Sequence, residues 1–324
     1  MPKVSVIIPI YGVEKYIEKC ARSLFEQTLE DIEFIFVDDC TPDKSVEILN
    51  NVISSYPNRG AQIRIVKHET NKGLPFARKT GLSYATGDYI IHCDSDDWVE
   101  PQMYEVLYNK AIDENADIVW CDYYRASETS NIATPQRTLE DKEDHIKAIL
   151  RNKVLASTCN SLVKHELYNH EIAFSKYNML EDFVLMTQLY YLSDKIAYIN
   201  KPLYYYRINL TSICKSISEA KVLSNFQSAI ANTTFVHSFL KSNGMDNLDK
   251  YTIKGKIMIK NLLLPLLGQT KYQKLWINTY PEVNRQILLG KEFEAKVYIE
   301  MLILIFYRII PNAVFKKIAM HFSR

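Results

Sequence analysis

The stretch DYIIHCDSDD, residues 88–97, places a short apolar run directly before a cluster of acidic residues. A run of this length is too short for a helix, and its apolar character suits a strand that is buried on both faces. The carboxylates of Asp94, Asp96 and Asp97 would then lie at the end of that strand. Ligands of parallel α/β sheets bind beyond the carboxyl ends of the strands, so the stretch predicts a binding site if its neighbours form such a sheet.

The residues on either side of this stretch alternate between strand and helix patterns. Predicted strands lie over residues 4–9, 33–37, 63–66, 88–92 and 117–121. The helix after the second strand is expected to begin at Pro42, with Thr41 as its N-cap, and a later helix spans residues 101–114. Regular alternation of this kind implies βαβ units, and it predicts an α/β fold with a mostly parallel central sheet and helices on both faces.

The rest of the chain follows a different pattern. Residues 122–140 are polar and irregular, which predicts a loop or a mobile cover. Helical spacing resumes near Lys142, and from about residue 216 to the end the pattern is mainly helical. We therefore expect a C-terminal helical extension.

The composition is that of an ordinary folded protein. Of the 324 residues, 47% are hydrophobic and 24% are charged, and the formal net charge is +1. A domain that binds nucleic acid through bulk electrostatics usually carries a clustered positive excess, so this charge argues against nucleic acid as a partner. A small molecule or a polymer is the expected substrate.

The six cysteines and the N-terminus bear on the compartment. No CxxC pair is present and several cysteines lie in apolar runs, so we expect reduced thiols. The chain passes from Met1 almost directly into a strand pattern, without a basic region, a long apolar stretch and a cleavage site. Secretion is not expected, and the predicted location is cytoplasmic, either free or at the inner face of the cytoplasmic membrane.

Asp94 and Asp96 form a DxD pattern at the end of the fourth predicted strand. Two carboxylates on one short loop can hold Mg²⁺ or Mn²⁺ and leave coordination positions open for phosphate oxygens. The alternative is structural, because acidic residues favour helix N-termini and a helix is expected to begin near Pro101. The place of the pair at the carboxyl edge of the sheet favours the metal.

Asp38 and Asp39 end the second predicted strand. Their carboxylates would emerge at the same edge of the sheet, where they could accept hydrogen bonds from a base N–H or a ribose hydroxyl. The alternative is an Asx-type turn that leads into Thr41.

Arg78 lies in the second turn of the helix that is expected to follow Gly73. Its guanidinium could reach a diphosphate or pair with the acidic loop. A solvated surface arginine is the alternative, because the spacing alone is a weak signal.

Taken together, these segments resemble the inverting glycosyltransferases of family 2, which have the GT-A fold. The matching segments are VSVIIPIY at 4–11, VDD at 37–39, NxG at 71–73, AR at 77–78, GDYI at 87–90 and DSDDW at 94–98. Each segment is common, but their order and spacing together are specific. Glu181-Asp182 is similar to the ED pair of the family, and YYYR at 204–207 with Ser212 is similar to its closing segment, so the resemblance covers residues 3–212.

The resemblance implies roles for individual residues. Pro9, Tyr11 and Glu14 would border the nucleotide pocket, Asp39 would contact the base, Asp94 would lie near the ribose and bind the metal with Asp96, and Arg78 would lie nearby. Asp182 would be the general base, with Glu181 shaping the acceptor side. A sugar hydroxyl is a poor nucleophile until a carboxylate removes its proton, which is the chemistry that Asp182 would supply. Arg207 is a candidate contact for the diphosphate or the acceptor.

The resemblance also divides the chain into parts. Residues 1–212 would form the GT-A domain, with a nucleotide-sugar-binding half over 1–122 and an acceptor half over 123–212. Residues 213–324 would form the helical extension.

Two positions depart from the family pattern. Leu180 stands where glycine often precedes the ED pair, and Lys79 stands where asparagine often follows the arginine. The departures leave open how the backbone runs around Asp182 and what residue 79 contacts. Without the resemblance, Glu181 and Asp182 would be interpreted as the acidic start of a helix.

The segment 297–310 is apolar but is interrupted by Glu300 and Arg308. A bilayer span needs about 20 apolar residues, so this segment is too short and too charged to cross a membrane. From Met301 onward there is no acidic residue, while four Lys or Arg residues remain. This pattern suits peripheral contact of residues 297–324 with an anionic leaflet, and the alternative is a helix packed on its own domain.

The sequence thus predicts a metal-dependent inverting glycosyltransferase. It would move a hexosyl or N-acetylhexosaminyl group from a UDP-sugar to a glycan or lipid-linked glycan of a capsule, lipopolysaccharide or exopolysaccharide, with Mn²⁺ or Mg²⁺ stabilising the leaving diphosphate. A sugar-1-phosphate nucleotidyltransferase is one alternative, but it needs a glycine-rich loop after the first strand, where only Gly12 is present. A sugar-nucleotide-binding assembly protein without turnover is the other. The pattern indicates no oligomeric state.

Overall fold

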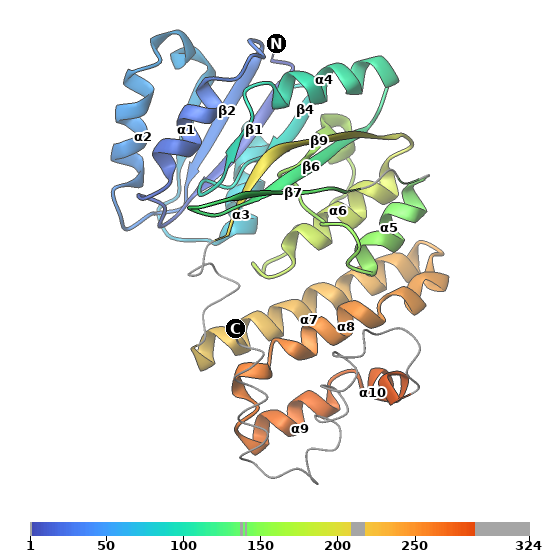
Figure 1. Ribbon diagram of the computed structural model, residues 1–324. Coiled ribbons are helices and arrows are strands. Elements are labelled where there is room, and N and C mark those ends of the chain that lie inside the picture. Colours follow the sequence, from blue (N-terminus) through green and yellow to red (C-terminus); the bar gives the residue numbers. More distant parts are fainter. Residues whose placement is uncertain (1, 137–138, 140, 209–217, 289–324) are drawn as a thin grey trace. The chain divides into compact units, whose positions relative to one another are not determined.

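The chain forms two compact units, seen in the computed structural model of Figure 1. One unit is made of residues 1–149 and 153–210, and the other of residues 150–152 and 211–324. The structure describes residues 2–136, 139, 141–208 and 218–288. None of the helices in this described part has the length and apolar character that a membrane crossing requires. The apolar segment 297–310 lies outside the described residues.

Four parallel strands form one half of the sheet in the first unit. They are β1 (Val4–Ile10), β2 (Ile32–Asp38), β3 (Ile63–Lys67) and β4 (Tyr89–His92), in the spatial order β3-β2-β1-β4. β1 pairs in parallel with β2 and β4, and β2 pairs in parallel with β3. All residues of β1 are buried, which is why this strand has no polar alternation. These are the first four strands that the sequence predicts, and the α/β fold class is confirmed.

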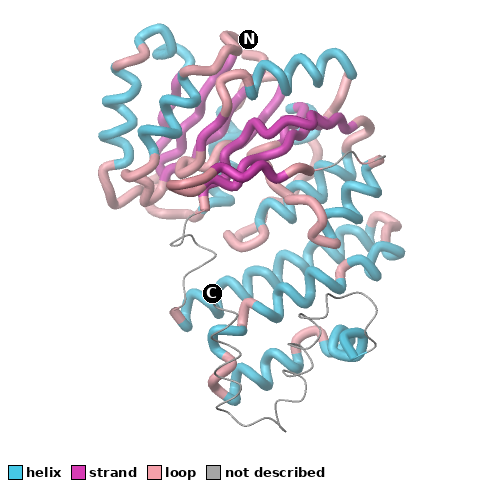
Figure 2. The backbone as a smooth tube through the Cα atoms, viewed as in Figure 1, coloured by secondary structure: helices cyan, strands magenta, loops and turns pink. Residues whose placement is uncertain are grey.

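The other half of the sheet is mixed. It contains β5 (Trp98–Val99), β6 (Ile118–Ala126), β7 (Asn131–Thr134), β8 (Ser161–Lys164) and β9 (Ile196–Arg207). β8 pairs antiparallel with β4 and β6, whereas β9 pairs in parallel with β6 and antiparallel with β5. β7 pairs antiparallel with β6. The described strands form one sheet of nine, drawn in magenta in Figure 2.

The predicted loop or cover over residues 122–140 is wrong for residues 122–126 and 131–134. β6 continues to Ala126, and β7 returns along it as a hairpin with Thr134 opposite Tyr123. Most residues of β7 are exposed, so the strand has no buried face. It therefore lacks the alternating apolar pattern by which a sequence reveals a strand.

Helices cover both faces of this sheet. They are α1 (Ile17–Phe25), α2 (Ser45–Ser54), α3 (Leu74–Tyr84), α4 (Met103–Glu114), α5 (Lys142–Leu150) and α6 (Glu181–Leu192), with 3-10 helices at Pro57–Gln62 and His165–Asn169. α1, α2 and α4 share a core with Val6 and Ile8 of β1. α3 packs on the opposite face, where a Cβ on Gly81 would lie 2.3 Å from Cγ2 of Ile7. A side chain at position 81 would therefore displace α3 from β1.

α2 begins later than predicted, at Ser45 rather than at Pro42. Thr41 does not cap the helix, because its hydroxyl accepts a hydrogen bond from Gly12 N–H at 2.9 Å and donates to Asp43 at 2.7 Å. Asp43 instead accepts from Ser45 N–H at 3.1 Å. Thr41 is thus used to tie the start of α2 to the end of β1.

The second unit is helical where it is described, as the sequence predicts. It contains α7 (Glu219–Ser242), α8 (Ile253–Asn261), α9 (Thr270–Asn278) and α10 (Pro281–Leu288), with 3-10 helices at Asp246–Tyr251 and Leu264–Leu266. Lys260 is fully buried, and its ammonium donates to the carbonyls of Trp276 and Thr279 and to Asn284 Oδ1, at 2.6, 2.5 and 2.8 Å. All three N–H groups of the ammonium therefore have acceptors, while burial lowers the pKa of Lys260 to about 7.

The cysteines of the described residues are free thiols, in agreement with the sequence. They are Cys20, Cys40, Cys93, Cys121 and Cys159, and Cys214 lies outside the described residues. All but Cys40 are buried, and burial raises the pKa of the Cys121 thiol. These side chains therefore act as small core residues.

Candidate active site

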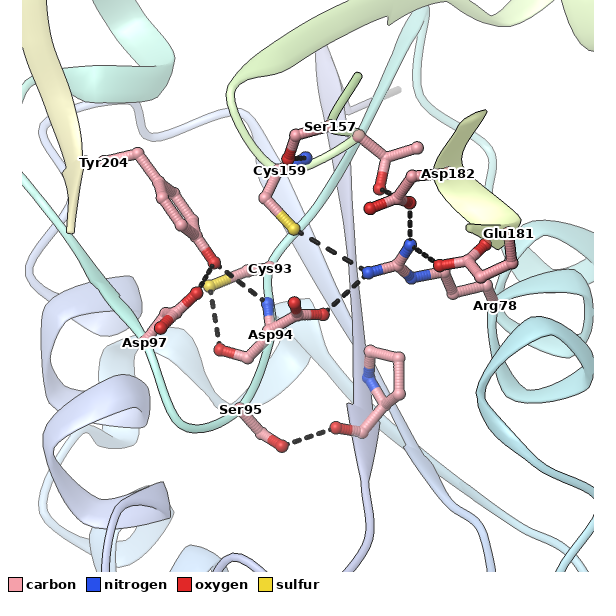
Figure 3. Close-up of polar contacts among 12 residues, drawn as sticks. Arg78, Cys93, Asp94, Ser95, Asp97, Ser157, Cys159, Glu181, Asp182 and Tyr204 are labelled. Carbon is pink, nitrogen blue, oxygen red and sulfur yellow. Dashed lines mark hydrogen bonds and ion pairs between the residues drawn. The ribbon is translucent and has the colours of Figure 1, made fainter. Parts of the chain in front are cut away.

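Arg78 joins the two acidic segments that the sequence singles out, as Figure 3 shows. Its side chain is 1% exposed, and Nη2 donates to Asp94 Oδ1 at 2.7 Å. Nη1 donates to Glu181 Oε1 and to Asp182 Oδ1. The alternative of a solvated surface arginine is therefore wrong. Arg78 pairs with the acidic loop, which is one of the two roles that the sequence left open for it.

Charge compensates for the burial of Arg78. Burial by itself would lower the pKa of the guanidinium, but the attraction of Asp182, Glu181 and Asp94 outweighs it and raises that pKa well above its ordinary value. Nη2 also approaches Sγ of Cys159 at 3.8 Å. One positive charge faces three carboxylates here, so the cluster keeps a negative excess when all of them are ionised.

Glu181 and Asp182 both begin α6 but lie in different surroundings. The side chain of Glu181 is 7% exposed, against 26% for Asp182. Burial raises the pKa of Glu181 well above its usual range; the charge of Arg78 opposes this, and the neighbouring Asp182 adds to it. Oδ1 of Asp182 also accepts a hydrogen bond of 3.0 Å from Thr158. Asp182 is thus the carboxylate of this pair that a molecule from solvent reaches more readily.

Asp97 is buried behind the DxD loop formed by residues 94–96 and does not face solvent. It is 2% exposed and accepts hydrogen bonds from the Tyr204 hydroxyl at 2.5 Å and from the Arg207 N–H at 2.7 Å. Burial raises the pKa of Asp97 well above its usual range, and the repulsion of Asp96 and Asp94 adds to the shift. Asp97 therefore holds the end of β9 against the DxD loop.

Asp94 and Asp96 carry the carboxylate oxygens that the sequence predicts as ligands of a divalent cation. The side chain of Asp94 is 31% exposed, and its bond to Arg78 uses Oδ1 only. The described residues contain no group of three His, Cys, Asp or Glu side chains placed to hold a metal, so an ion here would complete its shell with phosphate or water oxygens. The helix-cap alternative is wrong, because α4 begins at Met103 without a side-chain hydrogen bond at its N-cap.

Asp38 and Asp39 differ in what they contact. Asp38 Oδ1 accepts from Thr41 N–H at 2.8 Å, which is the Asx-type turn that the sequence offered as an alternative. Asp39 is 3% exposed, and its two oxygens accept from the N–H groups of Lys72 and Gly73, each at 2.8 Å. Asp39 thus fixes the turn that leads into α3 and hence the helix that carries the arginine.

His68 completes the surroundings of Asp39. Its Nδ1 lies 2.7 Å from Asp39 Oδ1, and its Nε2 lies 2.9 Å from Oγ1 of Thr80 on α3. The side chains of His68 and Asp39 are both 4% exposed. A carboxylate offers about four acceptor positions, so the three contacts of Asp39 leave one position on Oδ2.

Comparison with known proteins decides which enzymes this arrangement belongs to. The model of the family described as glycosyl transferase family 2 matches residues 5–173. The chain belongs to glycosyl transferase family 2. The putative glycosyltransferase EpsH of Bacillus subtilis is a relative that is 31% identical over 262 residues, which is 77% of this chain and 72% of EpsH. Glycosyltransferase GlyA of Streptococcus pneumoniae is 32% identical over 67% of this chain but only 32% of its own length.

Solved structures share the fold of this family 2 enzyme. S. aureus TarS 1-349 in complex with UDP has a TM-score of 0.57 and 19% identity, and the likeness covers 90% of this chain and 93% of that one. The complex of TarS 1-349 with UDP-GlcNAc has a TM-score of 0.59 and 16% identity, over 99% and 91%. At these identities the likeness concerns the fold, and it confirms the GT-A-like architecture.

Other residues that the family 2 resemblance singles out lie at the ends of β1 and β9. The carbonyl of Pro9 accepts a hydrogen bond of 2.6 Å from Ser95, which ties the DxD loop to β1. Tyr11 is 52% exposed, and Glu14 is also exposed. Arg207 is half-buried at the end of β9. Contacts of these residues with a nucleotide remain a prediction.

The two departures from the family 2 pattern have visible effects. Leu180 has φ 64° and ψ 29°, the left-handed region that glycine enters without cost. The turn before Glu181 therefore keeps the shape that glycine would give it, at some strain. Lys79 extends toward Phe174, with Nζ 5.8 Å from the ring centroid.

Sequence reasoning missed several residues of the site. Thr158 and Cys159 touch Asp182 and Arg78, and they lie just before β8, a strand that the sequence did not predict. The polar run STCNS at 157–161 before the apolar pair Leu162-Val163 is the one signal that could have indicated it. For His68 the signal is its position at the end of β3.

Proposed function

We propose that this glycosyltransferase moves a hexosyl or N-acetylhexosaminyl group from a UDP-sugar to a growing glycan of the cell surface. The observation that carries the proposal is the Arg78 cluster, because it brings the DxD loop against the Glu181-Asp182 pair. The TarS complexes with UDP and UDP-GlcNAc support the choice of donor. A poly(ribitol-phosphate) beta-glucosyltransferase among the relatives, 36% identical over 36% of this chain, supports a surface-polymer acceptor.

At the donor end, Asp94 and Asp96 would hold Mn²⁺ or Mg²⁺. When bound, the cation would neutralise charge that builds on the leaving diphosphate. A mannosyltransferase from Pyrobaculum calidifontis with the same fold was solved with GDP-Man and Mn²⁺, at a TM-score of 0.51, which supports a divalent ion. Pro9, Tyr11, Glu14 and Asp39 would border the nucleotide, with the open Oδ2 position of Asp39 directed to a base N–H.

At the acceptor end, Asp182 would act as the general base. The hydrogen bonds from Arg78 and Thr158 both reach Oδ1, so Oδ2 would accept the proton of an acceptor hydroxyl. That hydroxyl would attack the anomeric carbon from the face opposite the diphosphate. The proton passes to Asp182 as the new glycosidic bond forms and the bond to the diphosphate breaks, so the configuration inverts in one step.

The two alternatives that the sequence left open fit less well. A nucleotidyltransferase needs a glycine-rich loop after β1 to cradle a triphosphate, and residues 9–13 contain Gly12 alone. A binding protein without turnover would have no need for the Glu181-Asp182 pair beside Arg78. Membership of a transferase family also argues against it.

A thermal-shift screen over UDP, GDP, CDP and ADP, each with and without Mn²⁺, tests the donor. A ligand at a hundred times its dissociation constant adds about 2.7 kcal/mol to the free energy of unfolding, so UDP with Mn²⁺ should raise the melting temperature by several degrees. A larger shift with GDP would contradict the choice of uridine. No shift with any diphosphate would contradict the proposed function.

A further inference from the structure

Two cations, Lys19 and Arg207, lie over aromatic rings at the start of α1 and the end of β9. Nζ of Lys19 lies 3.0 Å from the ring centroid of Trp98, and Cζ of Arg207 lies 3.7 Å from that of Tyr16. Within the described part of the chain, neither side chain forms an ion pair or donates a hydrogen bond. Lys19 is exposed and Arg207 is half-buried, so the N–H donors of both side chains are open to a ligand that arrives from solvent.

The elements place these two cations side by side. Tyr16 is the N-cap residue of α1, and Lys19 lies in the first turn of that helix. Trp98 lies opposite Tyr205 in the register of β5 and β9, and Arg207 follows two residues later on the same face of β9. Burial lowers the pKa of Lys19, and the charge of Arg207 lowers it further, as proximity requires.

Aromatic stacking holds this surface in place. The rings of Trp98 and Tyr205 stack at 5.1 Å and 14°, and those of Tyr205 and Tyr124 stack at 4.5 Å and 19°. The hydroxyl of Tyr205 donates to Glu100 at 2.5 Å, so this carboxylate already has a hydrogen-bond partner. The Trp98 ring under Lys19 is thus itself supported by stacking.

The cation pair adjoins the catalytic loop. The backbone N–H of Arg207 donates to Oδ1 of Asp97 at 2.7 Å. Arg207 therefore lies next to the residue that follows the DxD pair. Arg207 was expected to contact a diphosphate or an acceptor, but no sequence pattern pointed to Lys19.

We propose that Lys19 and Arg207 form a subsite for a phosphate group of a substrate. The subsite deepens the proposed function, on which it rests only for the identity of that substrate. Two like charges at close range repel each other, and a phosphate between them would replace this repulsion by charge-assisted hydrogen bonds. The phosphate belongs either to the acceptor, which would then be an anionic glycan or a lipid phosphate, or to the diphosphate of the donor.

Binding of inorganic phosphate at constant ionic strength tests the subsite without any turnover. Calorimetric titration should show that Lys19→Met and Arg207→Gln each weaken phosphate binding about tenfold, because each removes one charged hydrogen-bond donor. Arg207→Lys keeps the charge but loses the planar fork, so its phosphate affinity should lie between those of the wild type and Arg207→Gln. Arg64→Gln is the matched control, since Arg64 also lies over a ring, that of Tyr84 at 5.4 Å, without an ion pair in the described residues.

A second titration, in the presence of saturating UDP and Mn²⁺, separates the two sources. Unchanged phosphate affinity would assign the subsite to the acceptor, whereas displacement of phosphate by UDP would assign it to the donor diphosphate. The proposal is overturned if wild type, Lys19→Met and Arg207→Gln bind phosphate equally while circular dichroism shows all three folded. A chain that binds phosphate here but transfers no sugar would instead contradict the proposed function alone.

Discussion

Thr158 donates a hydrogen bond of 3.0 Å to Oδ1 of Asp182, the same oxygen that accepts from Arg78. Two donors on one oxygen fix the rotation of the carboxyl group and leave the other oxygen for a substrate. A base held in this way does not have to be ordered again in each catalytic cycle. This geometry adds a reason from the structure to a role for Asp182 that the sequence assigned by family resemblance.

We predict that Asp182→Asn lowers transfer about a hundred- to ten-thousandfold, because it keeps the shape and removes the base. The dissociation constant for UDP in Mn²⁺ should change little, since Asp182 acts on the acceptor. Glu181→Gln is the matched control and should be milder in transfer, but it should lower the melting temperature more, because Glu181 is the more buried partner of Arg78. Equal loss of transfer in both variants would return the choice of base to Glu181.

Replacement of Arg78 should damage stability and catalysis together. Arg78→Met leaves three carboxylates without their shared cation, and breaking a buried charge pair typically costs about 3–5 kcal/mol. Denaturant unfolding should show this loss, with partial recovery in Arg78→Lys, which keeps the charge but reaches fewer oxygens. Wild-type stability in Arg78→Met would mean that the carboxylates do not depend on this cation.

Nucleotide binding should depend on a divalent cation through Asp96. Phosphate and carboxylate repel each other unless a cation bridges them, so Asp96→Ala should weaken binding of UDP in Mn²⁺ severely. Asp97→Asn, on the buried neighbour, should keep its response to Mn²⁺. Equal UDP affinity with EDTA, with Mn²⁺ and in Asp96→Ala would show that the metal assignment is wrong.

His68 should act as a positioning residue for Asp39. We expect His68→Ala to raise the dissociation constant for UDP about tenfold while the rate at saturating donor changes little, because the lost contact orients a group at the base and not at the reacting carbon. Thr80→Val removes only the outer hydrogen bond of His68 and should have a smaller effect. A fall in the saturated rate without a change in UDP affinity would contradict this assignment.

Residues 297–324 should mediate salt-sensitive binding to membranes, as their apolar run and acid-free basic end predict. The full chain should sediment with anionic liposomes at low salt, and a chain that ends at residue 296 should not. If both sediment equally, or neither does, the segment packs on its own domain instead.

Much of the first unit can be predicted because buried strands require continuous apolar residues, which are visible in the sequence. β1 and β2 are covered on both faces, so their residues form continuous apolar runs of strand length. β7 and β8 leave weaker traces. β7 is mostly exposed, and β8 is only four residues long, as short as β4 but without its flanking motifs.

The site is predictable to a similar degree. Spacing and family resemblance single out Arg78, Asp94 and Asp182, because acidic clusters and turn motifs are local features of a chain. The contacts of Thr158 and His68 depend on which segments fold side by side, and no local pattern encodes that. The cap of α2 fails for a related reason, since the Thr41 hydroxyl is used by Gly12 across the sheet.

The Arg78 cluster also bears on the order of events in folding. Arg78 and Glu181 are 103 positions apart in the chain, so the cluster closes a long loop and gains nothing until β1 to β4, β8 and α6 are in place. During synthesis, an N-terminal segment that ends before α6 would hold a buried guanidinium with Asp94 as its only carboxylate partner of the three. We infer that such a nascent segment keeps α3 loosely docked, and that the catalytic centre is among the last parts of the first unit to become ordered.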